Sequence, residues 1–137
     1  MLKRVLFGGE SGLSIAANAG LTLLRIFTAL LMSHGMGKIP PSEGLINTTA
    51  GIGFPAPTAF AWGAGLAEAL GGACLALGLF TRPAAFFIAF TMGTALLGVH
   101  RHDPFGKQEM AFLYFFIAIA YLLMGSGDWS LDRFLRK

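Results

Sequence analysis

The chain has 137 residues, of which 55% are hydrophobic and only 12% charged, and its formal net charge is +3. Soluble domains carry roughly 25% charged residues, so this composition argues against a soluble protein and for an integral membrane protein. The single cysteine, Cys74, excludes an internal disulfide and dithiol redox chemistry within the chain. The basic residues lie in predicted loops and termini, where membrane topology explains them without nucleic acid.

Residues 1–13 are predicted to form a short surface segment. Lys3 and Arg4 resemble the start of a signal peptide, but the stretch from Phe7 to Gly12 interrupts any apolar core. The first predicted membrane span follows at about residues 15–37, and Pro40 comes shortly after it.

Three further spans are predicted over about residues 58–80, 83–101 and 107–125. Crossing lipid takes about 20 mostly apolar residues, which each segment supplies. The apolar runs are continuous and show no period-2 alternation, which argues against a transmembrane barrel. We therefore expect one all-α domain over residues 1–137, an integral membrane four-helix bundle with up-down topology.

A short interfacial helix is expected at the C-terminus, after the break at Gly125. Ser130 is the predicted cap of this helix, and Trp129 is predicted to lie at the level of the lipid headgroups. Its basic side chains would face lipid phosphates; they belong to Arg133, Arg136 and Lys137.

The distribution of basic residues predicts the orientation of the chain. Four spans place both termini on one side, which carries Lys3, Arg4, Arg82, Arg133, Arg136 and Lys137. The other side carries Lys38, Arg101 and Lys107. Because positive charge gathers on the cytoplasmic side, we expect both termini in the cytoplasm.

Arg25 and Glu68 are the formally charged residues deep in the first and second spans. At 1.5 Å per residue they lie roughly 15 Å and 18 Å from the inner ends of their spans. An unpaired charge at such depth costs about 2.5–3.5 kcal/mol or more. We therefore expect Arg25 and Glu68 to form a buried ion pair, helped by small residues in the second span that allow close packing.

The outer ends of the spans carry further ionisable side chains. His34 and Lys38 are four residues apart and share one helix face, His100 ends the third span, and Glu109 opens the fourth. We expect His34, His100 and Glu109 to line one cavity that is reached from the outer leaflet. His34 and Glu109 are the candidate catalytic residues, and no metal site is predicted.

Several stretches in order resemble the DoxX family of small four-helix bacterial membrane proteins. These are LLRIFTALLMSHGMGKI at 23–39, GFPAP at 53–57, LAEALGGACLALGLFTRPAAF at 66–86, GVHRHDPF at 98–105, Glu109, and GSGDWSLDRFL at 125–135. Two features depart from the family: the segment before residue 14 is long, and Ser126 stands where a proline is common.

The resemblance implies an oxidoreductase in the bacterial inner membrane with a link to sulfur or thiol oxidation. Related subunits belong to thiosulfate:quinone oxidoreductase, and some members are associated with soluble redox partner proteins. We therefore expect a membrane subunit of a quinone-linked redox system. Its candidate quinone-binding residues are His34, Lys38, His100 and Glu109. A quinone headgroup needs hydrogen-bond donors or proton carriers at its carbonyls, and a histidine such as His34 suits that task because this residue type exchanges protons near neutral pH. Glu109 could relay the protons.

Two alternatives stay open at this point. The first is a non-enzymatic membrane anchor or scaffold for a redox complex, which the small size of the chain supports. The second is a carrier of haem b with His34 and His100 as axial ligands; we rank it lower because histidines at a membrane rim are commonly interfacial. A copper site at Met32, His34 and Met36 ranks lower still, because methionines at helical spacing usually serve packing.

Overall fold

The computed structural model describes residues 1–137, except for the side chain of Leu31. Helices make up the regular structure of these residues. In chain order they are α1 (Leu2–Phe7), α2 (Ile15–Met32), the 3₁₀ helix η1 (Ser33–Lys38), α3 (Glu43–Gly51), α4 (Pro57–Leu77), α5 (Thr81–Thr94), the π-helical turn η2 (Ala95–Val99), α6 (Phe105–Met124) and α7 (Leu131–Arg136).

Four segments are long and apolar enough to cross a membrane, as predicted. They are Ile15–Lys38, Pro57–Leu77, Thr81–Val99 and Phe105–Met124. The second ends three residues earlier than expected, because Gly78 adopts a left-handed conformation with φ of 62° and terminates the helix. The all-α four-helix membrane fold is therefore confirmed.

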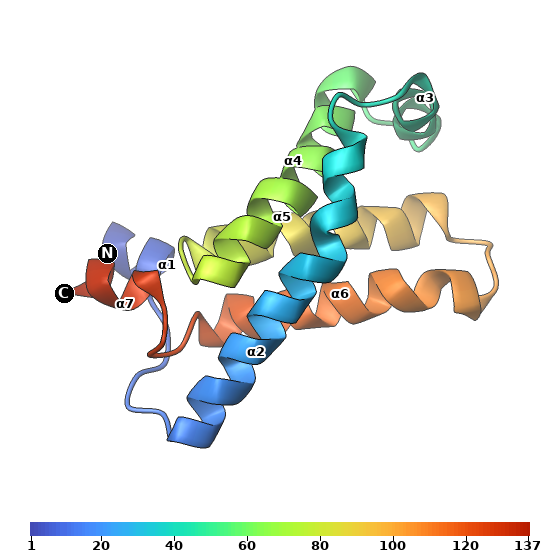
Figure 1. The fold of residues 1–137 in the computed structure, drawn as a ribbon. Helices are drawn as coiled ribbons and strands as arrows, with labels where there is room; N and C mark the ends of the chain where they lie inside the picture. Colours follow the sequence, from blue (N-terminus) through green and yellow to red (C-terminus); the bar gives the residue numbers. More distant parts are fainter.

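The four spans form two antiparallel pairs (Figure 1). Helices α2 and α4 lie side by side, and α5 and α6 form a second pair that crosses the first at a steep angle. Both termini, with α1 and α7, lie at one end of the molecule, which we call the termini side. Helix α3 and the loop between η2 and α6 lie at the other end, the distal side.

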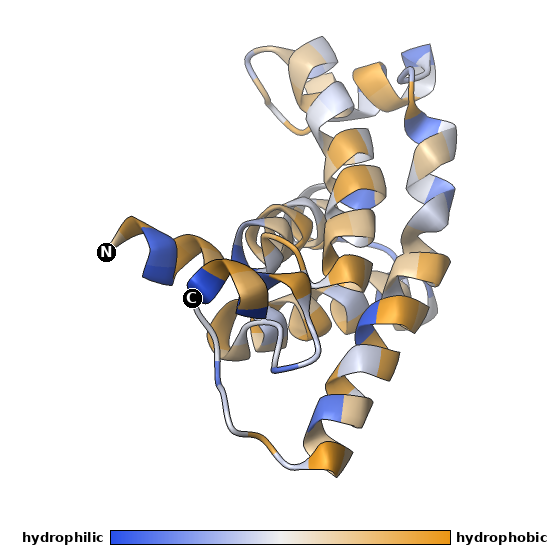
Figure 2. Cartoon of the chain, turned by 60° about the vertical axis from the view of Figure 1, so that its left-hand side comes forward, coloured by the Kyte–Doolittle hydropathy of each residue, from blue (hydrophilic) through white to orange (hydrophobic). Residues whose placement is uncertain are grey.

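Apolar side chains cover the outside of the spans as well as their interior. The buried core includes Met32, Leu75, Ile88, Tyr114 and Tyr121. Large apolar side chains are also exposed along every span, and hydrophobic residues occur along the length of the span helices (Figure 2). Helices that are apolar all round need lipid or protein on their outer faces, so the exposed pattern agrees with a bilayer around the bundle.

The structure does not bring Arg25 and Glu68 together, which corrects the expected ion pair. Glu68 packs against Gly35, whereas the Arg25 guanidinium packs against Gly78. Gly78 follows Glu68 by ten residues, or about 15 Å along a helix axis. The depth estimate failed because the start of α2 runs past the end of α4 and lies instead beside α6, where the Tyr121 hydroxyl donates to the Leu21 carbonyl at 2.6 Å.

Arg25 is bound at the termini side. Its side chain is 1% exposed, and Nη2 donates to the Trp129 carbonyl at 2.6 Å and to the Thr22 hydroxyl at 3.2 Å. The buried carboxylate of Asp132 attracts the Arg25 charge electrostatically. The counter-charge of Arg25 therefore comes from the C-terminal segment, residues 125–137, and not from α4.

The predicted C-terminal helix is present as α7, but Ser130 does not cap it. Its hydroxyl lies 2.8 Å from the Ser126 hydroxyl and donates to the Gly127 carbonyl at 3.0 Å. Asp132 performs a different capping task, because its carboxylate accepts the backbone N–H groups of Phe80 (2.8 Å) and Thr81 (3.0 Å) at the start of α5.

Asp128 fastens the N-terminal segment to the same C-terminal segment. Its carboxylate accepts the backbone N–H groups of Gly12 (3.3 Å) and Leu13 (2.9 Å) and the side-chain amide of Asn18 (3.2 Å). These hydrogen bonds, led by the one from Leu13, hold the pKa of Asp128 below its usual value. Residues 125–132 thus tie the segment before α2, the body of α2 and the start of α5 together.

Candidate functional site

A cavity of about 680 Å³ opens at the distal half of the bundle, between α3, α4, α5 and η2. Its walls are mainly apolar and rich in aromatic rings, with Phe54, Phe60, Phe86, Phe87 and Phe90 among the lining residues. The rings of Phe54 and Phe60 stack with centroids 4.3 Å apart. Phe86 and Phe87 are also half-exposed on the outer face of α5, so this wall of the cavity borders the lipid.

Three ionisable side chains, Lys38, Glu68 and His100, stand among the lining residues. Four threonines line the cavity as well, and the hydroxyls of these residues donate to carbonyls one turn earlier in their own helices. They are Thr48, Thr49, Thr91 and Thr94. Because those hydroxyl protons are engaged, Lys38 and His100 are the side chains best able to donate to a ligand.

Glu68 is the centre of the charged cluster. Its side chain is 2% exposed, and Oε1 accepts from Lys38 Nζ at 2.7 Å. On the other oxygen, His34 Nε2 lies 3.4 Å from Oε2. The imidazole of His34 is 55% exposed, so Glu68 joins the interior of the cavity to a side chain that reaches the surface.

Small residues allow this approach. A Cβ atom at Gly35 would collide with the side chain of Glu68, and one at Gly65 would lie 3.1 Å from the Lys38 carbonyl oxygen. The tighter winding of η1 after α2 presents both His34 and Lys38 to Glu68. The sequence Ser33–Lys38, with two glycines in six residues, is therefore the local feature that builds the cluster.

His100 lies at the end of η2, where its backbone N–H donates to the Ala95 carbonyl at 2.8 Å. Its Nδ1 lies 2.8 Å from Asp103 Oδ2, and this hydrogen bond is the main reason why the pKa of Asp103 falls below its usual value. Gln108 donates to the backbone carbonyls of His100 (2.6 Å) and Asp103 (3.0 Å) and fixes the loop. With Nδ1 engaged, Nε2 is the ring nitrogen that can meet a ligand.

The structure brings some of the predicted site residues together and not others. Lys38 and His100 line the cavity, and His34 contacts its wall through Glu68. Glu109 is exposed on α6 and is not among the lining residues. The cavity expected between His34, His100 and Glu109 is thus built instead around Lys38, Glu68 and His100.

Sequence reasoning missed the role of Glu68 and the cover provided by α3. The depth of Glu68 in its span predicts a pair with Arg25, and residues 43–51 lie between the first two predicted spans. Ser42 did carry a usable signal, because its hydroxyl accepts the Leu45 N–H at 3.2 Å and caps α3. The two threonines and the asparagine in this helix weaken its helical signal.

Comparisons with known proteins give a consistent picture. The sequence model of the DoxX family matches residues 20–101, a range that contains Lys38, Glu68 and His100. The chain is similar to "Putative oxidoreductase CatD" of Bacillus subtilis, with 33% identity over 120 residues that cover 86% of this chain and 88% of the relative.

Two further relatives match the chain with similar identity and coverage. Inner membrane protein YphA of Escherichia coli is 35% identical over 123 residues, covering 82% of this chain and 88% of the relative. An uncharacterised protein of Haemophilus influenzae is 32% identical over 126 residues, covering 85% of this chain and 92% of the relative. No solved structure matches the chain.

Proposed function

The chain belongs to the DoxX family of membrane proteins, and on this premise we propose that it is the quinone-binding membrane subunit of a redox system. The observation that carries the proposal is the aromatic cavity with Lys38 and Glu68 in its wall. One relative is named as an oxidoreductase, which supports redox chemistry over a purely structural role.

The residues of the cavity fit a quinone by size and by chemistry. Pockets for small ligands measure about 300–1,000 Å³ and are mostly apolar, with a few placed polar groups. Phe54, Phe60 and Phe90 offer faces and edges for a flat ring. Lys38 Nζ and His100 Nε2 are suitable donors to the two carbonyl oxygens, and an isoprenoid tail would leave past Phe86 and Phe87 toward the lipid.

Glu68 and His34 provide a path for protons in this proposal. A quinone takes up two electrons and two protons when it becomes a quinol. Lys38 donates a proton to the quinone oxygen, Glu68 returns a proton to Lys38 through Oε1, and Glu68 takes its replacement through Oε2, the oxygen nearest His34. Histidine is the side chain type that exchanges protons with water near neutral pH, and the His34 ring is exposed enough to do so.

Electron transfer is assigned to a partner protein, with a sulfur or thiol compound as the proposed electron donor. We further propose the bacterial inner membrane as the location, supported by the name of the relative YphA. Both termini then lie in the cytoplasm, and the cavity opens in the outer half of the bilayer. The six basic residues of the termini side support this orientation.

Binding of decyl-ubiquinone to the detergent-purified protein tests the proposal. We expect saturable binding by the wild type and about tenfold or greater weakening in Lys38→Met, because a hydrogen bond from a charged donor contributes about 1.5–3 kcal/mol. Lys107→Met, which removes an exposed cation outside the cavity, is the matched control and should bind as the wild type does. Absence of saturable binding by the wild type would favour an anchor or scaffold instead.

A further inference from the structure

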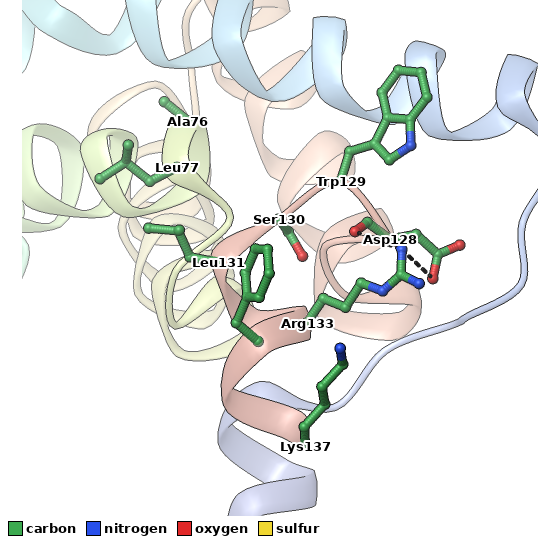
Figure 3. Close-up of a pocket in the computed structure, with 9 residues that line it drawn as sticks. Ala76, Leu77, Asp128, Trp129, Ser130, Leu131, Arg133 and Lys137 are labelled. Carbon is green, nitrogen blue, oxygen red and sulfur yellow. Dashed lines mark hydrogen bonds and ion pairs between the residues drawn. The ribbon is translucent and has the colours of Figure 1, made fainter.

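A second hollow of about 620 Å³ lies at the termini side, between the end of α4 and the C-terminal segment. Figure 3 shows Ala76, Leu77 and Leu131 on one side of it, and Arg133 and Lys137 on the other. Phe134 also lines this groove. The groove is thus apolar on one side and cationic on the other, unlike the aromatic cavity of the distal side.

Hydrogen bonds on the inner face of α7 fix the position of this helix beside the groove. The Asp132 carboxylate binds the start of α5, and its backbone N–H donates to the Gly78 carbonyl at 2.8 Å. Arg136 donates to the Gly127 and Gly9 carbonyls at 2.8 Å each. With its inner face anchored in this way, α7 leaves Leu131, Phe134 and Leu135 exposed.

The charge beside the groove is only partly neutralised. Arg133 is 51% exposed, and its Nη1 lies 3.9 Å from Asp128 Oδ1. That carboxylate already accepts from Gly12, Leu13 and Asn18, so it offers Arg133 only a weak partner. Lys137 is exposed at the end of α7. Further cations on this side of the molecule come from Lys3, Arg4, Arg82 and Arg136.

We propose that this groove binds an anionic phospholipid, with its phosphate between Arg133 and Lys137 and an acyl chain along Leu77, Leu131 and Phe134. Such a lipid joins an anion directly to an alkyl chain, and the groove offers a cationic edge directly beside an apolar floor. A headgroup with uncompensated negative charge is favoured over phosphatidylcholine, because basic residues near a bilayer surface attract anionic lipids. Trp129, half-exposed at the edge of the groove, suits the headgroup level.

The proposal is independent of quinone binding and concerns a retained lipid, not general contact with the bilayer. Native mass spectrometry of the full chain, purified with equal amounts of phosphatidylglycerol and phosphatidylcholine, measures which lipid stays bound. We expect the wild type to retain phosphatidylglycerol preferentially. Arg133→Gln/Lys137→Gln should reduce that retention about tenfold or more, since each cation near the surface contributes to the attraction.

Two controls make the test decisive. Arg101→Gln/Lys107→Gln makes the same charge change on the distal side and should retain the lipid as the wild type does. Lys137→Gln alone breaks no hydrogen bond or ion pair among the described residues and should give an intermediate loss. Equal retention of both lipids by the wild type, equal loss in the distal control, or displacement of the lipid by soluble glycerol phosphate at millimolar concentration would overturn the proposal.

Discussion

Lys38 and Glu68 form a 2.7 Å contact between η1 and α4, on the wall of the aromatic cavity. The Glu68 carboxylate is only 2% exposed, so removing its cation partner would leave it buried without a charge of opposite sign. The pair therefore both joins two spans and places ionisable groups beside a lipid-facing cavity. Packing and the proposed chemistry depend on the same two side chains.

The Lys38–Glu68 pair predicts non-additive stability changes. Lys38→Met leaves the Glu68 carboxylate buried with a weaker set of partners, and we expect a loss of about 1–3 kcal/mol, because Lys38 is partly exposed. Glu68→Gln in the same chain should restore part of this loss, since no buried charge remains. Unfolding of the single and double variants in mixed micelles measures the coupling.

Arg25→Gln combined with Glu68→Gln is the matched comparison. Arg25 packs against Gly78 and Glu68 against Gly35, so the two losses should add within about 0.5 kcal/mol. Strong coupling between Arg25 and Glu68, with none between Lys38 and Glu68, would contradict the register of α2 and α4 in this structure.

Arg25 itself is predicted to hold the C-terminal segment in place. Arg25→Met removes the 2.6 Å hydrogen bond to the Trp129 carbonyl and the charge that faces Asp132. We expect faster tryptic cleavage at Arg133 and Arg136 and a loss of about 1.5–3 kcal/mol, as for hydrogen bonds from charged groups. Arg4→Met, on the exposed face of α1, should leave the cleavage rate unchanged; equal rates in wild type and Arg25→Met would refute the assignment.

Asp128 predicts a loss of stability in acid. Hydrogen bonds from Leu13, Asn18 and Gly12 lower the pKa of this residue in the folded state. The unfolded-state pKa of an aspartate is about 3.9. Because the folded-state pKa of Asp128 is lower, its ionised carboxylate stabilises the fold above about pH 3.9, and this stabilisation is lost as the pH falls through the folded-state pKa. We expect the wild-type melting temperature to fall on acidification below about pH 4 more than that of Asp128→Asn. Parallel curves for the two proteins would show that Asp128 does not contribute in this way.

The proposed orientation is testable by cysteine labelling. In a Cys74→Ala background, Lys137→Cys and Glu43→Cys place single exposed thiols on the termini side and on α3. A membrane-impermeant maleimide applied to spheroplasts should label the α3 position at once and the C-terminal position only after lysis. Labelling of the C-terminal position alone before lysis would reverse the expected topology. Labelling of both positions before lysis would exclude it.

The sequence predicted the four spans because long apolar runs with few charges leave little choice of structure. It could not predict the offset between α2 and α4, since counting residues from each span end assumes that all ends lie at one depth. The roles of Asp128 and Asp132 were also out of reach. Their hydrogen bonds join segments 51 to 116 residues apart, and no periodic pattern reports such contacts. Lys38 and His100 were found because each stands beside a long apolar run.

Filling the aromatic cavity is the sharpest test of quinone binding at this site. Gly63 lines the aromatic cavity, and a Cβ atom there would meet no other atom within 4 Å, so Gly63→Leu can occupy the space without a backbone clash. Gly20→Leu is the matched control, because Gly20 is equally unobstructed but lies on an exposed face of α2 outside the cavity. We expect Gly63→Leu to weaken decyl-ubiquinone binding about tenfold or more at unchanged folding, while Gly20→Leu binds as the wild type does. Equal affinity of the two variants would contradict the assignment of this cavity to quinone.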